Sequence, residues 1–155
     1  MSADTRLNPE LCNCLALRQA ARHVTQFYDQ FLASAGLRST QFSILARLRR
    51  LGPMTINALA AELVMDRTTV GRNLQPLERE GLVAVVKGRT DRRSREIHLT
   101  GAGAERFRTA VEGWVKAQAG FEAAFGVQRS SELRALLHAV SASDLDGAGS
   151  RASPG

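Results

Sequence analysis

The feature that most constrains the fold is a change of apolar period between residues 67 and 99. Residues 67–80 place Val70, Leu74 and Leu77 at three- and four-residue steps, which predicts an amphipathic helix. Residues 82–87 are then rich in β-branched side chains, residues 88–94 are polar, and residues 95–99 alternate, which predicts a β-hairpin. The fold must therefore contain a helix that leads directly into a hairpin.

Helical periodicity also marks the segments on either side of this unit. Further helices are expected over residues 9–33, 40–51 and 56–64, and others begin after Thr100 and Ser130, which we expect to be N-caps. In the helix after Thr100, the apolar stripe includes Phe107, Val111, Trp114 and Val115. The sequence thus predicts a mainly α fold with a small β-hairpin wing (α+β), a winged helix-turn-helix flanked by long helices.

Length and composition exclude several classes of protein. The 155 residues are 44% apolar, enough for one domain, and no apolar run approaches the roughly 18 to 20 residues that span a bilayer. The first twenty residues lack the layout of a secretory signal, so we expect a soluble, cytoplasmic protein that does not contact a membrane. The Gly-, Ser- and Ala-rich residues 144–155 are expected to form a disordered tail, and residues 1–8 a flexible arm.

The sequence carries no pattern typical of an enzyme or of a metal site. The only two cysteines, in Cys12-Asn13-Cys14, do not fit a zinc motif, and no glycine-rich phosphate loop or zinc-protease motif occurs. No signature supports a cysteine and histidine pair as nucleophile and base. We therefore expect no enzymatic activity, no metal and no cofactor.

The positive charge of the chain is concentrated. The net charge is +6, and residues 67–95 alone carry eight basic and three acidic groups. An exposed α-helix fits the major groove of DNA, where arginine can bond guanine, asparagine can bond adenine, and threonine can reach a base edge or a phosphate. The expected contacts from recognition helix 67–80 are Arg67, Thr68, Thr69, Arg72 and Asn73, and those from the tip of wing 88–94 are Arg89, Arg92 and Arg93. Double-stranded DNA is the expected partner.

These motifs resemble the multiple-antibiotic-resistance regulator (MarR) family of bacterial transcription factors. The family pattern of the wing is matched by Asp91, Arg93, Leu99, Thr100 and Gly103. Residues 65–70 and 77–83 are similar to the start and end of the family's recognition helix, and the resemblance covers roughly residues 10–142.

The resemblance implies a homodimeric regulator, expected to be a repressor, that binds a pseudo-palindromic operator. Residues 9–36 and 101–143 would be its dimerisation helices, and residues 37–100 its DNA-binding lobe. Asp91 would order the wing by pairing with a nearby arginine while Arg93 reaches DNA. Phosphate contacts are expected from Ser39, Thr40 and Gln41.

The resemblance also implies release of DNA by a signal, and three alternatives stay open. The first is a small aromatic acid, carboxylate or acyl thioester. It would bind a slot formed by Arg18, Arg22, His23, Phe27, Tyr28 and Trp114. On the competing interpretation, Phe27 and Trp114 belong to the dimer core and the arginines cover a helix surface.

The second alternative is a redox response through Cys12 and Cys14, which are expected in the first two turns of the first helix, where the helix dipole favours a thiolate. Two helical residues two positions apart point about 200° apart, so a bond from Cys12 to its mate in a second copy is more plausible than an internal one. On the competing interpretation, both cysteines are packing residues. The third alternative is a DNA-binding accessory protein without an effector.

Overall fold

The computed structural model describes residues 8–151. The chain divides into two compact units, Met1–Ala117 and Gln118–Gly155. The boundary lies inside one long helix, α5 (Gly101–Phe125), rather than between two helices. The arm expected over residues 1–8 lies outside the described residues except for Asn8.

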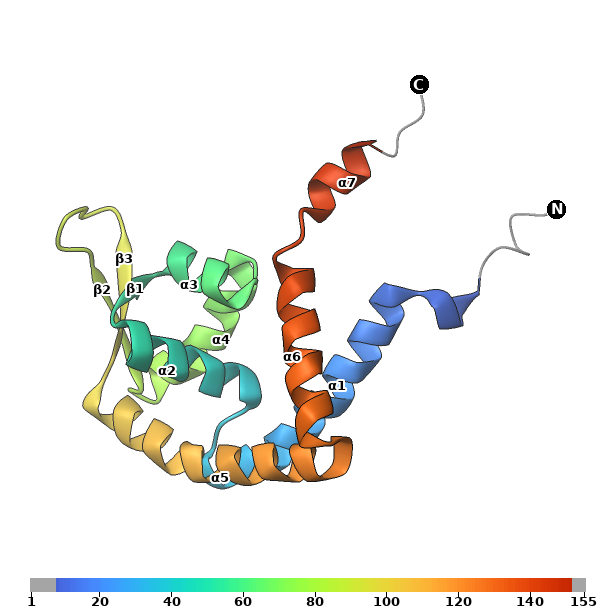
Figure 1. The fold of residues 1–155 in the computed structure, drawn as a ribbon. Helices are drawn as coiled ribbons and strands as arrows, with labels where there is room; N and C mark the ends of the chain where they lie inside the picture. Colours follow the sequence, from blue (N-terminus) through green and yellow to red (C-terminus); the bar gives the residue numbers. More distant parts are fainter. Residues whose placement is uncertain (1–7, 152–155) are drawn as a thin grey trace. The chain divides into compact units, whose positions relative to one another are not determined.

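The first unit contains a bundle of helices and a small sheet, which Figure 1 shows beside one another. Its helices are η2 (Pro9–Leu11), α1 (Asn13–Leu32), η3 (Ala33–Ala35), α2 (Ser39–Leu51), α3 (Ile56–Leu63), α4 (Arg67–Arg79) and the first part of α5. Its strands are β1 (Met54–Thr55), β2 (Val83–Lys87) and β3 (Arg95–Leu99). The predicted mainly helical fold with a hairpin wing is confirmed.

The sheet is antiparallel in the order β1-β3-β2. Val83 pairs with Leu99 and Lys87 with Arg95, so the hairpin closes over residues 88–94 as the sequence predicts. The short strand β1 was not predicted; its Met54 pairs with Ile97 on the other edge of β3. This edge strand ties the base of the wing to the connection between α2 and α3.

A single apolar core holds the recognition helix against the rest of the first unit. Val70, Leu74 and Leu77 of α4 are all buried, as their spacing predicts. They belong to one cluster with residues of α1, α2, α3 and β3, such as Leu32, Ile44, Leu45, Leu59 and Ile97. Burial of this face fixes which side of α4 remains available to a partner.

The fully buried residues of helix α5 are all small. Gly103, Ala110, Gly113 and Ala117 are its buried residues, and a Cβ on Gly113 would overlap the backbone carbonyl oxygen of Phe31. Trp114 and Val115, expected in the apolar stripe of this helix, are 37% and 52% exposed, whereas Phe107 and Val111 of the same stripe pack against the core. The glycine allows α5 to lie directly on α1, and Trp114 and Val115 remain at the surface of the single chain.

The turn between α3 and α4 contains the chain's one described non-glycine residue of positive φ. Val64 has φ 52° and ψ 49°, and the N–H of Met65 donates to the carbonyl oxygen of Ala60 at 2.9 Å. A left-handed residue at this position ends a helix, but glycine or asparagine usually occupies it. The tight turn of the helix-turn-helix therefore forms on a β-branched residue, at a cost in backbone strain.

The second unit contains the end of α5, α6 (Val127–Ser141) and α7 (Leu145–Arg151). Ser130 is not the N-cap of α6: it lies in the first turn, fully buried, and its hydroxyl donates to the carbonyl oxygen of Gly126 at 2.6 Å. The expectation of a disordered tail from residue 144 is wrong for Leu145–Arg151, which is helical. Within residues 8–151, no helix is both long and apolar enough to cross a membrane.

Candidate nucleic-acid interface

Asp66 sets the start of α4. Its backbone is extended, and its carboxylate accepts hydrogen bonds from the Thr69 backbone N–H at 2.8 Å and from the Thr69 hydroxyl at 2.7 Å. These bonds hold the pKa of the Asp66 carboxyl below its usual value, the hydroxyl having the larger effect. Asp66 was not predicted as the N-cap, although aspartate is one of the residues preferred at that position.

The exposed face of α4 carries unpaired cations. Arg67, Thr68 and Arg72 are exposed, opposite the buried Val70 and Leu74. Among the described residues, the ion pairs do not include Arg67 or Arg72. These guanidinium groups have no competing carboxylate that a phosphate or a base would have to displace.

Two other predicted base-reading residues are bonded within the chain. Thr69 uses its hydroxyl on Asp66, and the Asn73 side-chain amide donates to the Thr69 carbonyl oxygen at 2.8 Å. Both side chains are half-buried. Asn73 would have to give up this bond to donate the same proton to a base.

The wing tip is a tight turn ordered by Asp91. The Asp91 carboxylate accepts from the Arg93 backbone N–H at 2.9 Å, and the Asp91 carbonyl oxygen accepts from the Ser94 hydroxyl at 2.8 Å. The N–H of Gly88 donates to the Ser94 carbonyl oxygen at 2.9 Å. Gly88 is buried, and a Cβ there would overlap the Ser94 hydroxyl, so the turn requires glycine at this position.

Asp91 orders the wing differently from the way the resemblance implied. The expected partner was an arginine side chain, but within the described chain the Asp91 carboxylate forms no ion pair and accepts a backbone N–H two residues on. This short-range bond is the usual one for aspartate in a turn. It leaves the side chains of Arg89, Arg92 and Arg93 exposed at the tip.

The predicted phosphate-contacting residues lie together at the start of α2. Ser39, Thr40 and Gln41 are half-buried, and the Gln41 side-chain oxygen accepts the backbone N–H of Arg38 at 3.0 Å. The Ser39 N–H donates to the carboxylate of Asp29 on α1 at 2.7 Å. Asp29 was not predicted as a partner of Ser39, since no local sequence pattern reveals a hydrogen bond between two helices.

The residues of the predicted effector slot fall into two aromatic groups. Phe27 contacts Tyr28 and Phe31, with ring centroids 5.9 and 5.1 Å apart. Trp114 instead stacks on Phe42 of α2 at 6.4 Å, and Phe42 stacks on Phe107 at 5.1 Å. Arg18, Arg22 and His23 lie exposed on α1. The ring contacts do not join Trp114 to Phe27 or Tyr28.

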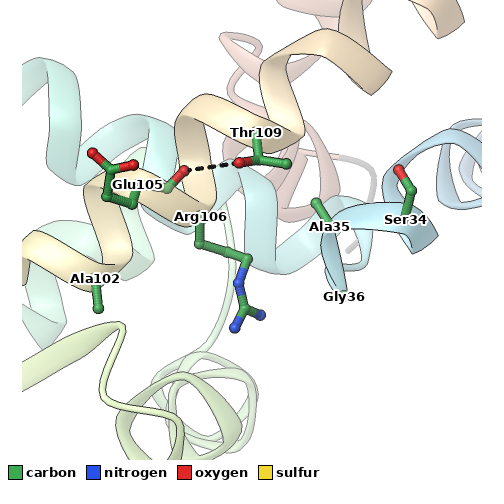
Figure 2. A pocket seen from close by; sticks show the side chains of 7 residues that line it. All are labelled: Ser34, Ala35, Gly36, Ala102, Glu105, Arg106 and Thr109. Atoms are coloured by element: carbon green, nitrogen blue, oxygen red, sulfur yellow. Dashed lines mark hydrogen bonds between the residues drawn. The ribbon is translucent and has the colours of Figure 1, made fainter.

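An open pocket of about 570 Å³ lies elsewhere in the first unit, between η3 and the start of α5 (Figure 2). It is lined by Ser34, Ala35, Gly36, Ala102, Glu105, Arg106 and Thr109. None of the six predicted effector residues lines it. Its one cation, Arg106, is bonded to Glu80 at 3.0 Å.

The two cysteines are free and exposed, but only Cys14 lies in α1. Cys12 is the extended N-cap, and its sulfur accepts the backbone N–H of Leu15 at 3.4 Å. Because Cys12 is not helical, the expected separation of about 200° between the two side chains does not apply. Within residues 8–151, no three His, Cys, Asp or Glu side chains are grouped to hold a metal ion.

Comparisons with known proteins agree with this geometry. A sequence model described as the MarR family matches residues 37–94. The chain is 34% identical over 84 residues to an uncharacterized HTH-type transcriptional regulator, YwoH of Bacillus subtilis; the match covers 54% of this chain and 61% of YwoH. The chain spans about three fifths of the length of the curated relatives that it matches.

Solved structures cover more of the chain. The transcriptional regulator MosR of M. tuberculosis, in complex with DNA, is 38% identical, with a TM-score of 0.73 over 86% of this chain and 99% of MosR. BpsR of Bordetella bronchiseptica, whose DNA binding is regulated by 6-hydroxynicotinic acid, has a TM-score of 0.79 over 89% of this chain and 99% of BpsR, at 21% identity, which is a likeness of fold. These relatives are transcriptional regulators and not enzymes. With its winged helix-turn-helix, its wing motif and these relatives, the chain belongs to the MarR family of transcriptional regulators.

Proposed function

We propose that this chain is a DNA-binding transcriptional repressor, active in the cytoplasm as a homodimer, that reads a pseudo-palindromic operator with α4 and the β2–β3 wing. One observation carries the proposal: the arginines of α4 and of the wing tip are exposed and, in the described part of the chain, have no acidic partner. Cations left unpaired in this way favour a polyanion. The DNA complex of MosR supports the assignment.

The roles follow from the chemistry of each surface. Arg67, Thr68 and Arg72, on the first turns of a helix whose opposite face is buried, would enter the major groove, where arginine can bond guanine through two hydrogen bonds. Arg89, Arg92 and Arg93 would contact the backbone or the adjacent minor groove. Ser39, Thr40 and Gln41 would contact phosphates that fix the register of the protein on the duplex.

A homodimer is supported by apolar side chains that one chain leaves at its surface. They lie on η2, α1, α5 and α6, and include Leu11, Leu15, Leu17, Trp114, Val115, Leu136, Leu137 and Val140. Large apolar side chains that stay exposed on the helices expected to form the dimer support an interface there. A twofold dimer would place two copies of α4 about one turn of DNA apart, roughly 34–36 Å, which matches a pseudo-palindrome.

A small aromatic or carboxylate effector, such as an aromatic acid or an acyl thioester, is the proposed signal. The stack of Phe107, Phe42 and Trp114 supports it, because Trp114 is 37% exposed and its indole could stack on a planar ligand. The regulation of BpsR by 6-hydroxynicotinic acid supports the same class of ligand. Arg18, Arg22, His23, Phe27 and Tyr28 would join this surface across the dimer.

A redox response is the second candidate, and the hydrogen bond from Leu15 to the Cys12 sulfur favours it. Oxidation of two Cys12 thiols, one from each copy, to a disulfide by peroxide, which is reduced to water, would draw the sulfur away from Leu15 and weaken the cap of α1. Peroxide should then release DNA reversibly in the native protein and not in the Cys12→Ser, Cys14→Ser double variant. Release that persists in the double variant would eliminate the cysteines as sensors. If neither oxidants nor aromatic acids change the DNA affinity of the protein, the remaining alternative is a DNA-binding accessory protein without an effector.

The test of DNA reading is selection of duplexes from a random pool, followed by titration of the selected and of a scrambled duplex. Arg72→Ala should cost about 1 to 3 kcal/mol on the selected duplex and relax preference at particular base pairs, because a base contact carries sequence information. Equal losses on both duplexes would reduce Arg72 to a phosphate contact. Failure of the native protein to enrich any sequence would contradict the proposed function.

A further inference from the structure

The segment that follows the recognition helix is held by the first turn of α5. The Thr100 hydroxyl donates to the Gly81 carbonyl oxygen at 2.6 Å and accepts the backbone N–H of Gly103 at 3.0 Å. The backbone N–H of Thr100 donates to the Leu82 carbonyl oxygen at 3.2 Å. One threonine thus caps α5 and holds Gly81 and Leu82, the two residues that follow the C-cap of α4.

Gly103 lets these segments approach closely. A Cβ on Gly103 would overlap the Leu82 carbonyl oxygen and would lie 2.8 Å from a methyl group of Leu99. The absence of a side chain is therefore required for α5 to pack on the chain immediately after α4.

Arg106 extends the same contact to the end of α4 itself. Its guanidinium lies 3.0 Å from the carboxylate of Glu80, the C-cap of α4, and the two side chains are 33% and 48% exposed. Figure 2 shows the Arg106 side chain leaving α5 between Ala102 and Gly36. A Cβ on Gly36 would lie 3.3 Å from the same guanidinium, so glycine at position 36 leaves space for the arginine side chain.

The two helices are therefore joined at consecutive positions. Residues 80, 81 and 82 contact residues 106, 100 and 103, which recur every three residues from the position before α5 into its first two turns. Gly81 has φ 72°, and the Leu82 N–H donates to the Leu77 carbonyl oxygen at 2.8 Å, so the same residues also terminate α4. A displacement of the start of α5 would move the end of the recognition helix.

We propose that Thr100, Gly103 and Arg106 are positioning residues that make the orientation of α4 follow that of α5; we call this contact the α4–α5 clamp. The proposal rests on the proposed function, since it assumes that α4 reads DNA. It assigns a role in operator recognition to residues that lie outside the predicted DNA contacts. Arg106 acts through Glu80 and not by touching DNA.

The test measures the DNA affinity of the variants Glu80→Gln and Arg106→Gln on the selected and on a scrambled duplex. The change in net charge alone and the α4–α5 clamp predict different results. Loss of an anion should strengthen binding to any duplex, and loss of a cation should weaken it. The clamp predicts instead that both variants lower the preference for the selected over a scrambled duplex, by about twofold to fivefold, as expected for a partly exposed ion pair. The double variant should lose no more than the single variants, since either one already breaks the pair.

Arg108→Gln is the matched control, because Arg108 lies on the same helix and its carboxylate partner, Glu105, is also on α5. Its duplex preference should equal that of the native protein. An unchanged preference in both clamp variants, or changes in opposite directions, would overturn the proposal.

Hydrogen exchange provides a second readout that does not depend on DNA. The amides of Gly81 and Leu82 close the end of α4 and should exchange several-fold faster in Arg106→Gln than in Arg108→Gln. Equal exchange in the two variants would overturn the clamp. A native protein that enriches no duplex would contradict the proposed function, and the exchange comparison would still decide whether the clamp exists.

Discussion

The carboxylate of Asp66 accepts two hydrogen bonds from a single residue, Thr69, one from its backbone N–H at 2.8 Å and one from its hydroxyl at 2.7 Å. This pair determines where the recognition helix begins. It also fixes the turn on which Arg67 and Thr68 project, because both residues lie between the two partners. A capping interaction thus orients the first residues that would meet DNA.

Asp66→Ala should weaken both the start of α4 and DNA binding. The variant leaves the first N–H groups of the helix without their acceptor, whereas Asp66→Asn retains an oxygen that can accept from Thr69. Thermal unfolding and titration of the selected duplex should rank the native protein and Asp66→Asn above Asp66→Ala. Indistinguishable behaviour of all three proteins would mean that the cap does not order the helix.

The same cap predicts a dependence of stability on pH. The hydrogen bonds from Thr69 lower the pKa of Asp66 in the folded chain. The ionised carboxylate therefore stabilises the folded state fully when the pH is above the usual pKa of an aspartate. This contribution is lost as the pH falls through the lowered pKa. The difference in Tm between the native protein and Asp66→Asn should therefore shrink between pH 7 and about pH 3. A difference that is constant over this range would contradict the assignment.

Alanine substitutions at two glycines should have opposite effects. Gly71→Ala, in α4 with open space around its Cβ, should stabilise the protein by up to about 1 kcal/mol through helix propensity. Gly88→Ala should disturb the wing tip, because its Cβ would lie 2.7 Å from the Asp91 carbonyl oxygen and overlap the Ser94 hydroxyl. Urea denaturation and DNA titration check both variants; normal DNA affinity in Gly88→Ala would show that the tip needs no fixed geometry.

Val64→Gly should stabilise the protein, because glycine adopts φ 52° without the penalty of a β-branched residue. The left-handed conformation costs an ordinary residue about 1 to 2 kcal/mol. Glycine avoids this cost, but it loses more backbone entropy on folding, so the net gain in stability is smaller. The control is Val86→Gly, at an exposed position in β2, which should destabilise the protein. A loss of stability in both variants would show that the Val64 side chain contributes more by packing than its backbone loses by strain.

Much of the fold was predictable, because it depends on local patterns. The period of Val70, Leu74 and Leu77 and the alternation around Ile97 locate α4 and the hairpin, and glycine at position 81 marks the end of the helix. The two-residue strand β1 has no such pattern, since it exists only through its pairing with β3. The close approach of Gly113 to Phe31 likewise depends on how two distant helices meet.

The candidate site was predictable in residue type but not in hydrogen bonding. Charge density located the arginines of α4 and the wing, and these are exposed. The bonds of Asn73 to Thr69, of Asp91 to Arg93 and of Ser130 to Gly126 depend on side-chain rotamers and on the exact helix boundaries. Residues such as Arg106 escaped notice because their partners lie more than twenty positions away in the chain.

The most direct test of DNA binding through α4 and the wing is the salt dependence of affinity for the selected duplex. Each phosphate contact contributes about −0.9 to the slope of log affinity against log salt, so Arg93→Ala should flatten the slope by about one contact per protomer. Arg108→Ala removes the same charge from an exposed position on α5 and should leave the slope unchanged. Equal slopes for the native protein and Arg93→Ala, or the same flattening in Arg108→Ala, would contradict a wing contact with DNA.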